Sequence, residues 1–105
     1  MYSTACLSGG FDQNDCVGEA WVLAPEGGGF YIGNSRYGWG EPGSPGEGPS
    51  DLYDQAFVAS VFQTGFTNLG KAHADAKHEF VGESRVDEYM RYVMYGLNLL
   101  GDPET

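Results

Sequence analysis

The stretch that decides how this chain is interpreted is Tyr2-Ser-Thr-Ala-Cys6-Leu-Ser-Gly-Gly10-Phe-Asp-Gln-Asn-Asp15-Cys-Val-Gly-Glu19. It opens with a short run that fits a buried strand, and Cys6 stands where that run ends. Two glycines and a polar turn follow before a helix pattern begins. Ligands of open α/β sheets bind beyond the carboxyl ends of the strands, and glycines let a substrate backbone come close. Cys6 is therefore a candidate nucleophile, although a free cysteine is more often a small buried hydrophobe.

The composition fits one acidic domain, or part of one. The chain has 105 residues, with 15 acidic against 5 basic side chains and a formal net charge of -10. Such a charge argues against nucleic acid and anionic membranes as partners. The acidic residues are scattered, which is typical of a solvated surface. No run is long enough to span a membrane, and no signal-peptide pattern follows Met1. Because the chain starts directly in a strand pattern, we expect an upstream portion.

Residues 16–23 carry apolar side chains at three- and four-residue steps, which predicts a short helix. Asp15 is its expected cap and Pro25 its expected stop. Residues 30–33, Phe-Tyr-Ile-Gly, form a compact aromatic and β-branched run that predicts a second buried strand. A strand, a short helix and a strand in succession favour a right-handed crossover with parallel strands.

Residues 34–50 are rich in glycine and proline, which predicts a long loop. We interpret residues 35–42, with Arg36, Tyr37 and Trp39, as a pocket wall, and residues 43–49 as a flexible span. Three amphipathic helices are expected after the loop. They are capped or started by Ser50, Leu69 and Ser84, and the last one has the expected buried face Val86, Met90, Val93, Met94 and Leu97. Residues 99–103 are expected to leave the last helix in a tight turn.

A nucleophilic cysteine needs a base, which is usually a histidine. The chain offers His73 and His78, but both lie among charged residues in what the sequence indicates is a solvated helix face. The sequence therefore indicates no base for Cys6. Pairing of Cys6 with Cys16 in a disulfide stays open, and it would silence the nucleophile.

Oxygen donors gather around the turn that follows Cys6: Asp12, Asn14, Asp15 and Glu19. Calcium uses such ligands, but the glycine and the terminal bidentate glutamate of a twelve-residue calcium loop are lacking. Helix capping and surface charge are the favoured interpretation. The cysteines and histidines lack the paired spacing of a zinc site.

Four segments together resemble the gingipain-like cysteine peptidases. Residues 4–12 with 16–20 are similar to the nucleophile region of that family. Residues 29–35 resemble its next core strand, residues 37–41 the loop after that strand, and residues 99–103 the end of its catalytic domain. The resemblance covers almost the whole chain, in order and with plausible spacing.

The resemblance implies an α/β fold, namely part of a caspase-like three-layer sandwich with a short parallel sheet flanked by helices. It implies peptide-bond cleavage with Cys6 as nucleophile and Cys16 as a structural residue. Residues 1–105 would be the C-terminal segment of the catalytic domain. The general base of the family is a histidine followed by glycine, and neither histidine here matches it. The base is thus expected upstream, and the isolated segment is expected to be inactive.

The resemblance also implies substrate-binding residues. Trp39 corresponds to a pocket wall, Tyr37 lies beside it, and Glu41 is the candidate specificity carboxylate. Relatives that cleave after basic residues use a carboxylate low in this pocket, and Glu41 is the only acid in the matching stretch. The backbone N–H of Cys6 is expected to be one oxyanion donor.

The expected partners are a polypeptide substrate and the upstream half of the same domain, with self-association as a further expectation. No cofactor is required, and calcium is a candidate structural ion. The resemblance implies secretion or a cell-surface location. The rival hypotheses are a catalytically silent module for calcium binding or assembly, and a transpeptidase acting in protein secretion.

Overall fold

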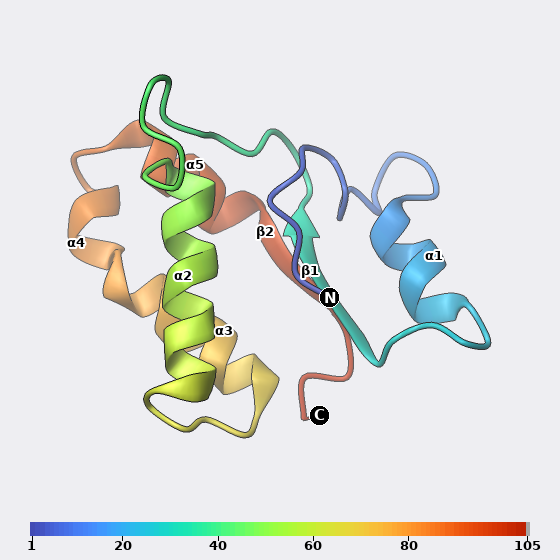
Figure 1. The fold of residues 1–105 in the computed structure, drawn as a ribbon. Helices are drawn as coiled ribbons and strands as arrows, with labels where there is room; N and C mark the ends of the chain where they lie inside the picture. Colours follow the sequence, from blue (N-terminus) through green and yellow to red (C-terminus); the bar gives the residue numbers. More distant parts are fainter. Residues whose placement is uncertain (105) are drawn as a thin grey trace.

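The computed structural model describes residues 1–104 of the protein. Its elements in chain order are α1 (Val17–Leu23), β1 (Phe30–Asn34), α2 (Pro49–Phe62), α3 (Leu69–Glu79), α4 (Val81–Ser84), α5 (Glu88–Gly96) and β2 (Leu97–Gly101). The two strands lie at the centre, with α1 on one side and the other helices on the opposite side (Figure 1). The fold is therefore mixed α/β, with helices on both sides of a small sheet.

The sheet is antiparallel, so the short parallel sheet predicted from the sequence is wrong. β1 pairs with β2 in a register that places Tyr31 opposite Leu100 and Ile32 opposite Leu99. The tight turn predicted for residues 99–103 is wrong for the same reason, because residues 99–101 complete β2. α5 leads into β2 without an intervening loop. β2 then runs along β1 in the opposite direction.

The predicted N-terminal strand is reduced to a single parallel bridge between Tyr2 and Ile32. The Ser3 N–H donates to the Ile32 carbonyl at 2.8 Å, and the Ile32 N–H donates to the Met1 carbonyl at 2.8 Å. The chain then bends at Ala5 and enters a turn. This bend carries Cys6 to the end of β1 at which the Gly/Pro-rich loop leaves.

Side chains alternate between the two faces of a strand. Helices cover both faces of this sheet, with α1 on one of them and the main core on the other. Ile32 and Leu97 belong to the main core, which they share with Tyr53, Ala56, Phe57, Ala72, Ala76, Phe80, Met90 and Val93. On the other face, α1 approaches the sheet closely at Gly18. A Cβ there would lie 2.8 Å from the Cδ1 atoms of both Tyr31 and Leu100. Only glycine therefore allows this contact.

The predicted helix over residues 16–23 is confirmed, with a different cap. The N-cap is Cys16 rather than Asp15, and the Cys16 N–H donates to Glu19 Oε2 at 3.1 Å. α2 starts at Pro49, one residue before the predicted cap Ser50. Proline suits the first helical position because no carbonyl there needs its N–H.

The last predicted helix starts too early. Ser84 ends the short α4, and α5 begins at Glu88 after the N-cap Asp87. The Asp87 Oδ1 accepts from the N–H of Tyr89 at 2.8 Å, which fixes this start. Val86 lies in the connection and is 91% exposed, so its predicted burial is wrong. The rest of that face is confirmed for Met90, Val93 and Leu97, which are buried, while Met94 is partly buried.

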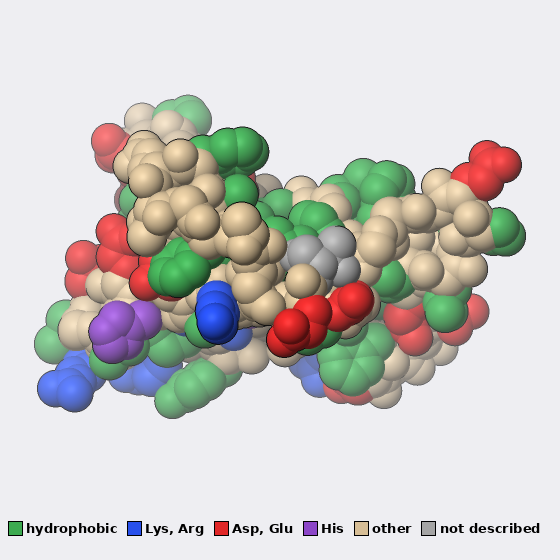
Figure 2. Space-filling model, turned by 90° about the horizontal axis from the view of Figure 1, so that it is seen from below, with side chains coloured by type: hydrophobic (Ala, Val, Ile, Leu, Met, Phe, Trp, Pro, Cys, Tyr) green, Lys and Arg blue, Asp and Glu red, His purple; other side chains and the backbone are tan. Residues whose placement is uncertain are grey.

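The surface agrees with scattered acidity. Figure 2 shows acidic side chains at both ends and in the middle of one face, with a histidine and most of the visible basic side chains towards the end away from α1. Among the helices of residues 1–104, none is long and apolar enough to cross a membrane.

Candidate active site

Cys6 lies on an exposed turn just after the residues that pair with β1. The next residue, Leu7, has a φ of 60°, in the left-handed region that bulky residues rarely adopt. The Leu7 N–H donates to the Arg36 carbonyl at 2.8 Å, and the Gly9 N–H donates to the Asn34 carbonyl at 2.9 Å. These two bonds attach the residues after Cys6 to the end of β1. A strained backbone, such as that of Leu7, is typical of functional sites.

The sulfur of Cys6 is held against the backbone of Gly38. The Gly38 N–H donates to Cys6 Sγ at 3.3 Å, and Sγ lies 3.6 Å from the Gly38 carbonyl, to which the thiol donates. A Cβ on Gly38 would lie 2.3 Å from the Thr4 carbonyl oxygen. Glycine at this position therefore allows the loop to reach the sulfur of Cys6.

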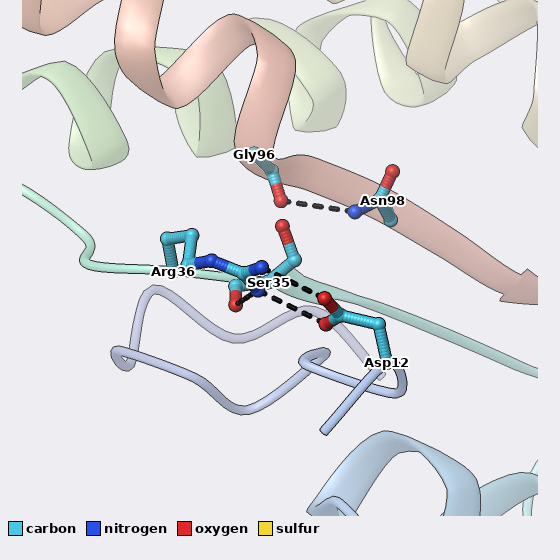
Figure 3. A network of polar contacts seen from close by, with 5 residues as sticks. All are labelled: Asp12, Ser35, Arg36, Gly96 and Asn98. Carbon is cyan, nitrogen blue, oxygen red and sulfur yellow. Dashed lines mark hydrogen bonds and ion pairs between the residues drawn. The ribbon is translucent and has the colours of Figure 1, made fainter.

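Arg36, just after β1, and Asp12, in the loop that follows Cys6 in the sequence, point toward each other (Figure 3). Two parallel hydrogen bonds join the guanidinium to the carboxylate, at 3.0 and 2.7 Å. The side-chain hydrogen bond to Arg36 lowers the pKa of Asp12 from its ordinary value, and the nearby positive charge adds to this effect. The ion pair is exposed, so its role is to order the loops rather than to stabilise the fold.

Trp39 follows Gly38 and forms a wall of a neighbouring cavity of about 410 Å³. Its ring lies 4.8 Å from the ring of Tyr89, centroid to centroid, and 6.5 Å from that of Tyr37. The backbone N–H of Trp39 donates to Ser50 Oγ at 2.9 Å, which connects the loop to the start of α2. Glu41 lines the same cavity. Tyr37 does not line it, but supports Trp39 from the side.

The sequence analysis missed other residues of this cavity. Glu47, Glu83, Asp87 and Tyr89 also line it. Glu83 lies in α4, and Asp87 is the N-cap of α5. From the sequence, Asp87 was expected inside the last helix and Glu83 just before its start at Ser84. Asp87 stands directly before a new apolar period, and aspartate is a common N-cap. This pattern could have indicated that a helix starts after Asp87.

A second cavity, of about 370 Å³, lies on the α1 side of Cys6. Cys6, Leu7, Asn14 and Cys16 are among the residues that line it. Both cysteines are free. Cys6 thus lines the cavity beside α1, and its contact Gly38 directly precedes Trp39, which lines the other cavity.

Neither histidine lines the Cys6 cavity. His73 is mostly buried, so the prediction of a solvated face is wrong for this residue. The pKa of His73 is lowered to about 4, first by burial and then by the charge of Lys77, while a hydrogen bond to the backbone of Leu97 opposes the shift. His78 lies in a separate surface hollow with Phe66. Within the described chain, the predicted nucleophile Cys6 therefore has no histidine beside it.

The oxygen donors near Cys6 make other contacts. Asp12 binds Arg36, and Glu19 accepts from the Cys16 N–H. Across residues 1–104, no group of three or more His, Cys, Asp or Glu side chains is placed to hold a metal ion.

With this geometry in view, a comparison with protein families matches the chain to Peptidase family C25 over residues 1–105. The chain belongs to peptidase family C25. This confirms the resemblance to gingipain-like cysteine peptidases that the sequence analysis identified. No curated protein and no solved structure matches the chain.

Proposed function

We propose that this C25 chain supplies the nucleophile and the main substrate pocket of a cysteine endopeptidase. The observation that carries the proposal is the contact of Cys6 with Gly38. The Gly38 N–H donates to the exposed thiol, and Gly38 directly precedes Trp39, which forms a wall of the cavity of about 410 Å³. In this proposal the Cys6 thiolate attacks the scissile carbonyl while the preceding side chain of the substrate occupies the Trp39 cavity.

The walls of the Trp39 cavity favour a positively charged side chain. The lining carries four carboxylates, from Glu41, Glu47, Glu83 and Asp87, and no lysine or arginine. A cation gains from these charges and from the faces of Trp39 and the neighbouring tyrosine. The structure thus adds three acids to Glu41, the only one in the matching loop, and supports a preference for lysine or arginine.

The general base enters this proposal from the upstream half of the same domain. His73 lies against the backbone of Leu97 and His78 in another hollow, so neither can take the proton of Cys6. We therefore expect residues 1–105 alone to hydrolyse no peptide. Peptide hydrolysis by this chain, lost on Cys6→Ala, would show that a base within it has been overlooked.

The lack of a histidine base beside Cys6 within the described residues leaves one rival, a catalytically silent assembly module, but the exposed thiol and the acidic cavity argue against it. A silent module needs neither a reactive thiol nor a pocket matched to a substrate. The resemblance to secreted peptidases extends our proposal to a secreted or cell-surface enzyme acting on polypeptides, with transpeptidation as an alternative outcome of the same acyl intermediate.

Peptidyl acyloxymethyl ketones test the proposal without a general base, because they trap a thiolate directly. Two reagents with the same backbone would carry lysine or norleucine next to the reactive carbon. We expect the lysine reagent to label Cys6 several-fold faster, and Glu83→Gln to reduce that preference. Glu79→Gln, on α3 and outside the cavity lining, is the matched control.

Equal labelling of Cys6 and Cys16 by both reagents would favour the silent module. Faster labelling of Cys6 without a preference between the reagents would retain the nucleophile but refute the cationic pocket.

A further inference from the structure

The peptide unit between Ala5 and Cys6 is held by two buried side chains. The Ser8 hydroxyl donates to the Ala5 carbonyl at 3.1 Å. The Asn34 side-chain amide donates to the carbonyls of Thr4 at 3.1 Å and Ala5 at 3.4 Å. Ser8 is 6% exposed and Asn34 is 1% exposed. Both donors therefore lie beneath the turn that carries the thiol.

The orientation of the Asn34 amide follows from its partners. Exchanging its oxygen and nitrogen would aim an oxygen at two carbonyl oxygens, so the nitrogen must face Thr4 and Ala5. The Oδ1 atom is buried and has no hydrogen-bond partner within residues 1–104. A buried acceptor without a partner costs free energy. The two hydrogen bonds of the amide nitrogen oppose this cost. Its donor side is the part that the turn uses.

These contacts determine the direction of the Cys6 N–H. In a trans peptide the C=O and the next N–H point to opposite sides. The Ala5 carbonyl points inward to Ser8 and Asn34, so the Cys6 N–H points away from them. Within residues 1–104 no acceptor is bonded to this N–H. It is thus available to a ligand bound at the exposed thiol.

We propose that Asn34 and Ser8 are positioning residues that fix the Ala5–Cys6 peptide so that the Cys6 N–H stabilises the oxyanion formed during attack on a carbonyl. The inference rests on the proposed function, because it takes Cys6 as the nucleophile. Neither side chain touches the substrate. Each acts through the carbonyl of Ala5, on the other end of the same peptide plane.

Two reagents separate the thiol from the oxyanion donor. With p-nitrophenyl acetate, the thiolate attacks the carbonyl carbon, the S–C bond forms, and the carbonyl electron pair moves to oxygen. The C–O bond then breaks, and its electron pair leaves with p-nitrophenolate. With iodoacetamide, sulfur displaces iodide from a saturated carbon and no oxyanion forms. Only the first reaction uses the Cys6 N–H.

The experiment uses the whole chain with Cys16→Ser, which leaves Cys6 as the only thiol. Asn34→Ala and Ser8→Ala should each slow acetylation by about tenfold, less than the loss of a whole oxyanion donor. The rate of alkylation by iodoacetamide should change less than about twofold, because no oxyanion forms in that reaction. Ser8→Thr keeps the hydroxyl and should recover most of the acetylation rate.

Matched controls remove similar hydrogen bonds elsewhere. Ser60 is buried, and its hydroxyl lies within hydrogen-bond distance of two acceptors, Asp75 Oδ2 at 2.7 Å and the Ala56 carbonyl at 2.9 Å. The Asn98 amide donates to the Gly96 carbonyl at 3.1 Å. Ser60→Ala and Asn98→Ala should leave the ratio of acetylation to alkylation unchanged. Circular dichroism and thermal melting identify any variant that fails to fold, and Ser8→Ala then tests the inference if Asn34→Ala is lost.

An equal fall in both rates would mean that the two residues hold the thiol rather than the N–H, and would overturn the inference. Unchanged acetylation in both variants would overturn it as well. If the chain with Cys16→Ser reacts no faster than a free cysteine peptide with either reagent, the proposed function fails, and the inference fails with it.

Discussion

The guanidinium of Arg36 and the carboxylate of Asp12 form a two-bond ion pair that joins the end of β1 to the loop after Cys6. The backbone carbonyl of the same arginine accepts the Leu7 N–H at 2.8 Å. Arg36 therefore holds the turn that carries Cys6 by its main chain and the following loop by its side chain. This relationship leads to the first prediction.

Arg36→Lys should loosen residues 11–15, because an ammonium cannot make the parallel pair of hydrogen bonds. We expect faster amide hydrogen exchange in those residues and an almost unchanged melting temperature, since both side chains are exposed. Asp12→Asn should have the same effect. Arg91→Lys, on the exposed side of α5, is the control, and loosening by this variant would show that the effect is not local. Because the pKa of Asp12 is lowered, the order of the loop should persist as pH falls below the ordinary range of a carboxyl group and then be lost.

The second prediction concerns the relative reactivity of the two thiols. Cys6 is exposed, whereas Cys16 is partly buried at the start of α1. Brief treatment with iodoacetamide should therefore alkylate Cys6 faster than Cys16, as peptide mapping would show. Equal labelling would count against Cys6 as the nucleophile.

The same experiment has a simple companion variant. Cys16→Ser should remove the second label and keep the helix start, because serine is a favoured N-cap residue. A change in stability within about 1 kcal/mol is expected from the usual range of N-cap substitutions. A larger loss would mean that the sulfur of Cys16 packs in a way that a hydroxyl cannot replace.

The sequence predicted those parts of the fold that are defined by local patterns. The helix over residues 16–23 was predicted from its apolar period, and the strand over residues 30–33 from its aromatic and β-branched run with flanking glycines. Both elements are present. β2 was missed because its apolar run follows α5 without a break, and periodicity alone cannot separate a short buried strand from the end of a helix. Its partner β1 lies far away in the sequence, so no local signal marks the pairing.

In the candidate site, too, some residues were predicted from local sequence patterns and others were not. Cys6 and Trp39 were predicted from their glycine-rich surroundings, and the structure brings them together through Gly38. Glu83 and Asp87 were not predicted, because only the packing of α4 and α5 beside the Gly/Pro-rich loop brings them to Trp39. The roles of these residues in binding and catalysis stay predictions.

The third prediction concerns Gly38→Ala. The new Cβ would lie 2.3 Å from the Thr4 carbonyl oxygen and 2.9 Å from the Asn34 amide nitrogen, so the loop must move away from the turn. We expect a loss of about 1–3 kcal/mol in the free energy of unfolding, the usual cost of overpacking. Labelling of Cys6 should also lose the preference between charged and neutral peptidyl reagents, because Trp39 moves with the loop.

Gly40→Ala is the matched control for this change. A Cβ on Gly40 meets no atom within 4 Å, although the residue lies only two positions further along the same loop. Its stability should match that of the unmodified chain, and its labelling should keep the preference for the charged reagent, although Gly40 also lines the cavity. If the two variants behave alike, the close contact at Gly38 is not what positions Trp39.

The fourth prediction concerns acid sensitivity through His73. The pKa of this buried imidazole is lowered from 6.5 to about 4, mainly because burial disfavours the charged form. The unfolded chain therefore binds a proton at a higher pH than the folded chain. Stability should be unaffected above about pH 6.5, fall as the pH decreases towards 4, and then stay level with respect to this residue. With allowance for partial exposure, we expect a loss of about 2 kcal/mol.

Chemical denaturation at pH 7 and pH 4.5 measures this loss, and two variants assign it. His73→Leu should reduce the difference in unfolding free energy between the two pH values, since leucine cannot take up a proton. His78→Leu changes an exposed histidine one turn further along the same helix and should leave the difference intact. Lys77 is also partly buried and donates to the Leu97 carbonyl at 2.6 Å, so its charge opposes protonation of His73 in the folded state. Lys77→Met should accordingly raise the pKa of His73 and make the protein less sensitive to acid. If His73→Leu and His78→Leu show the same dependence on pH as the unmodified chain, burial of His73 is not the source of acid sensitivity.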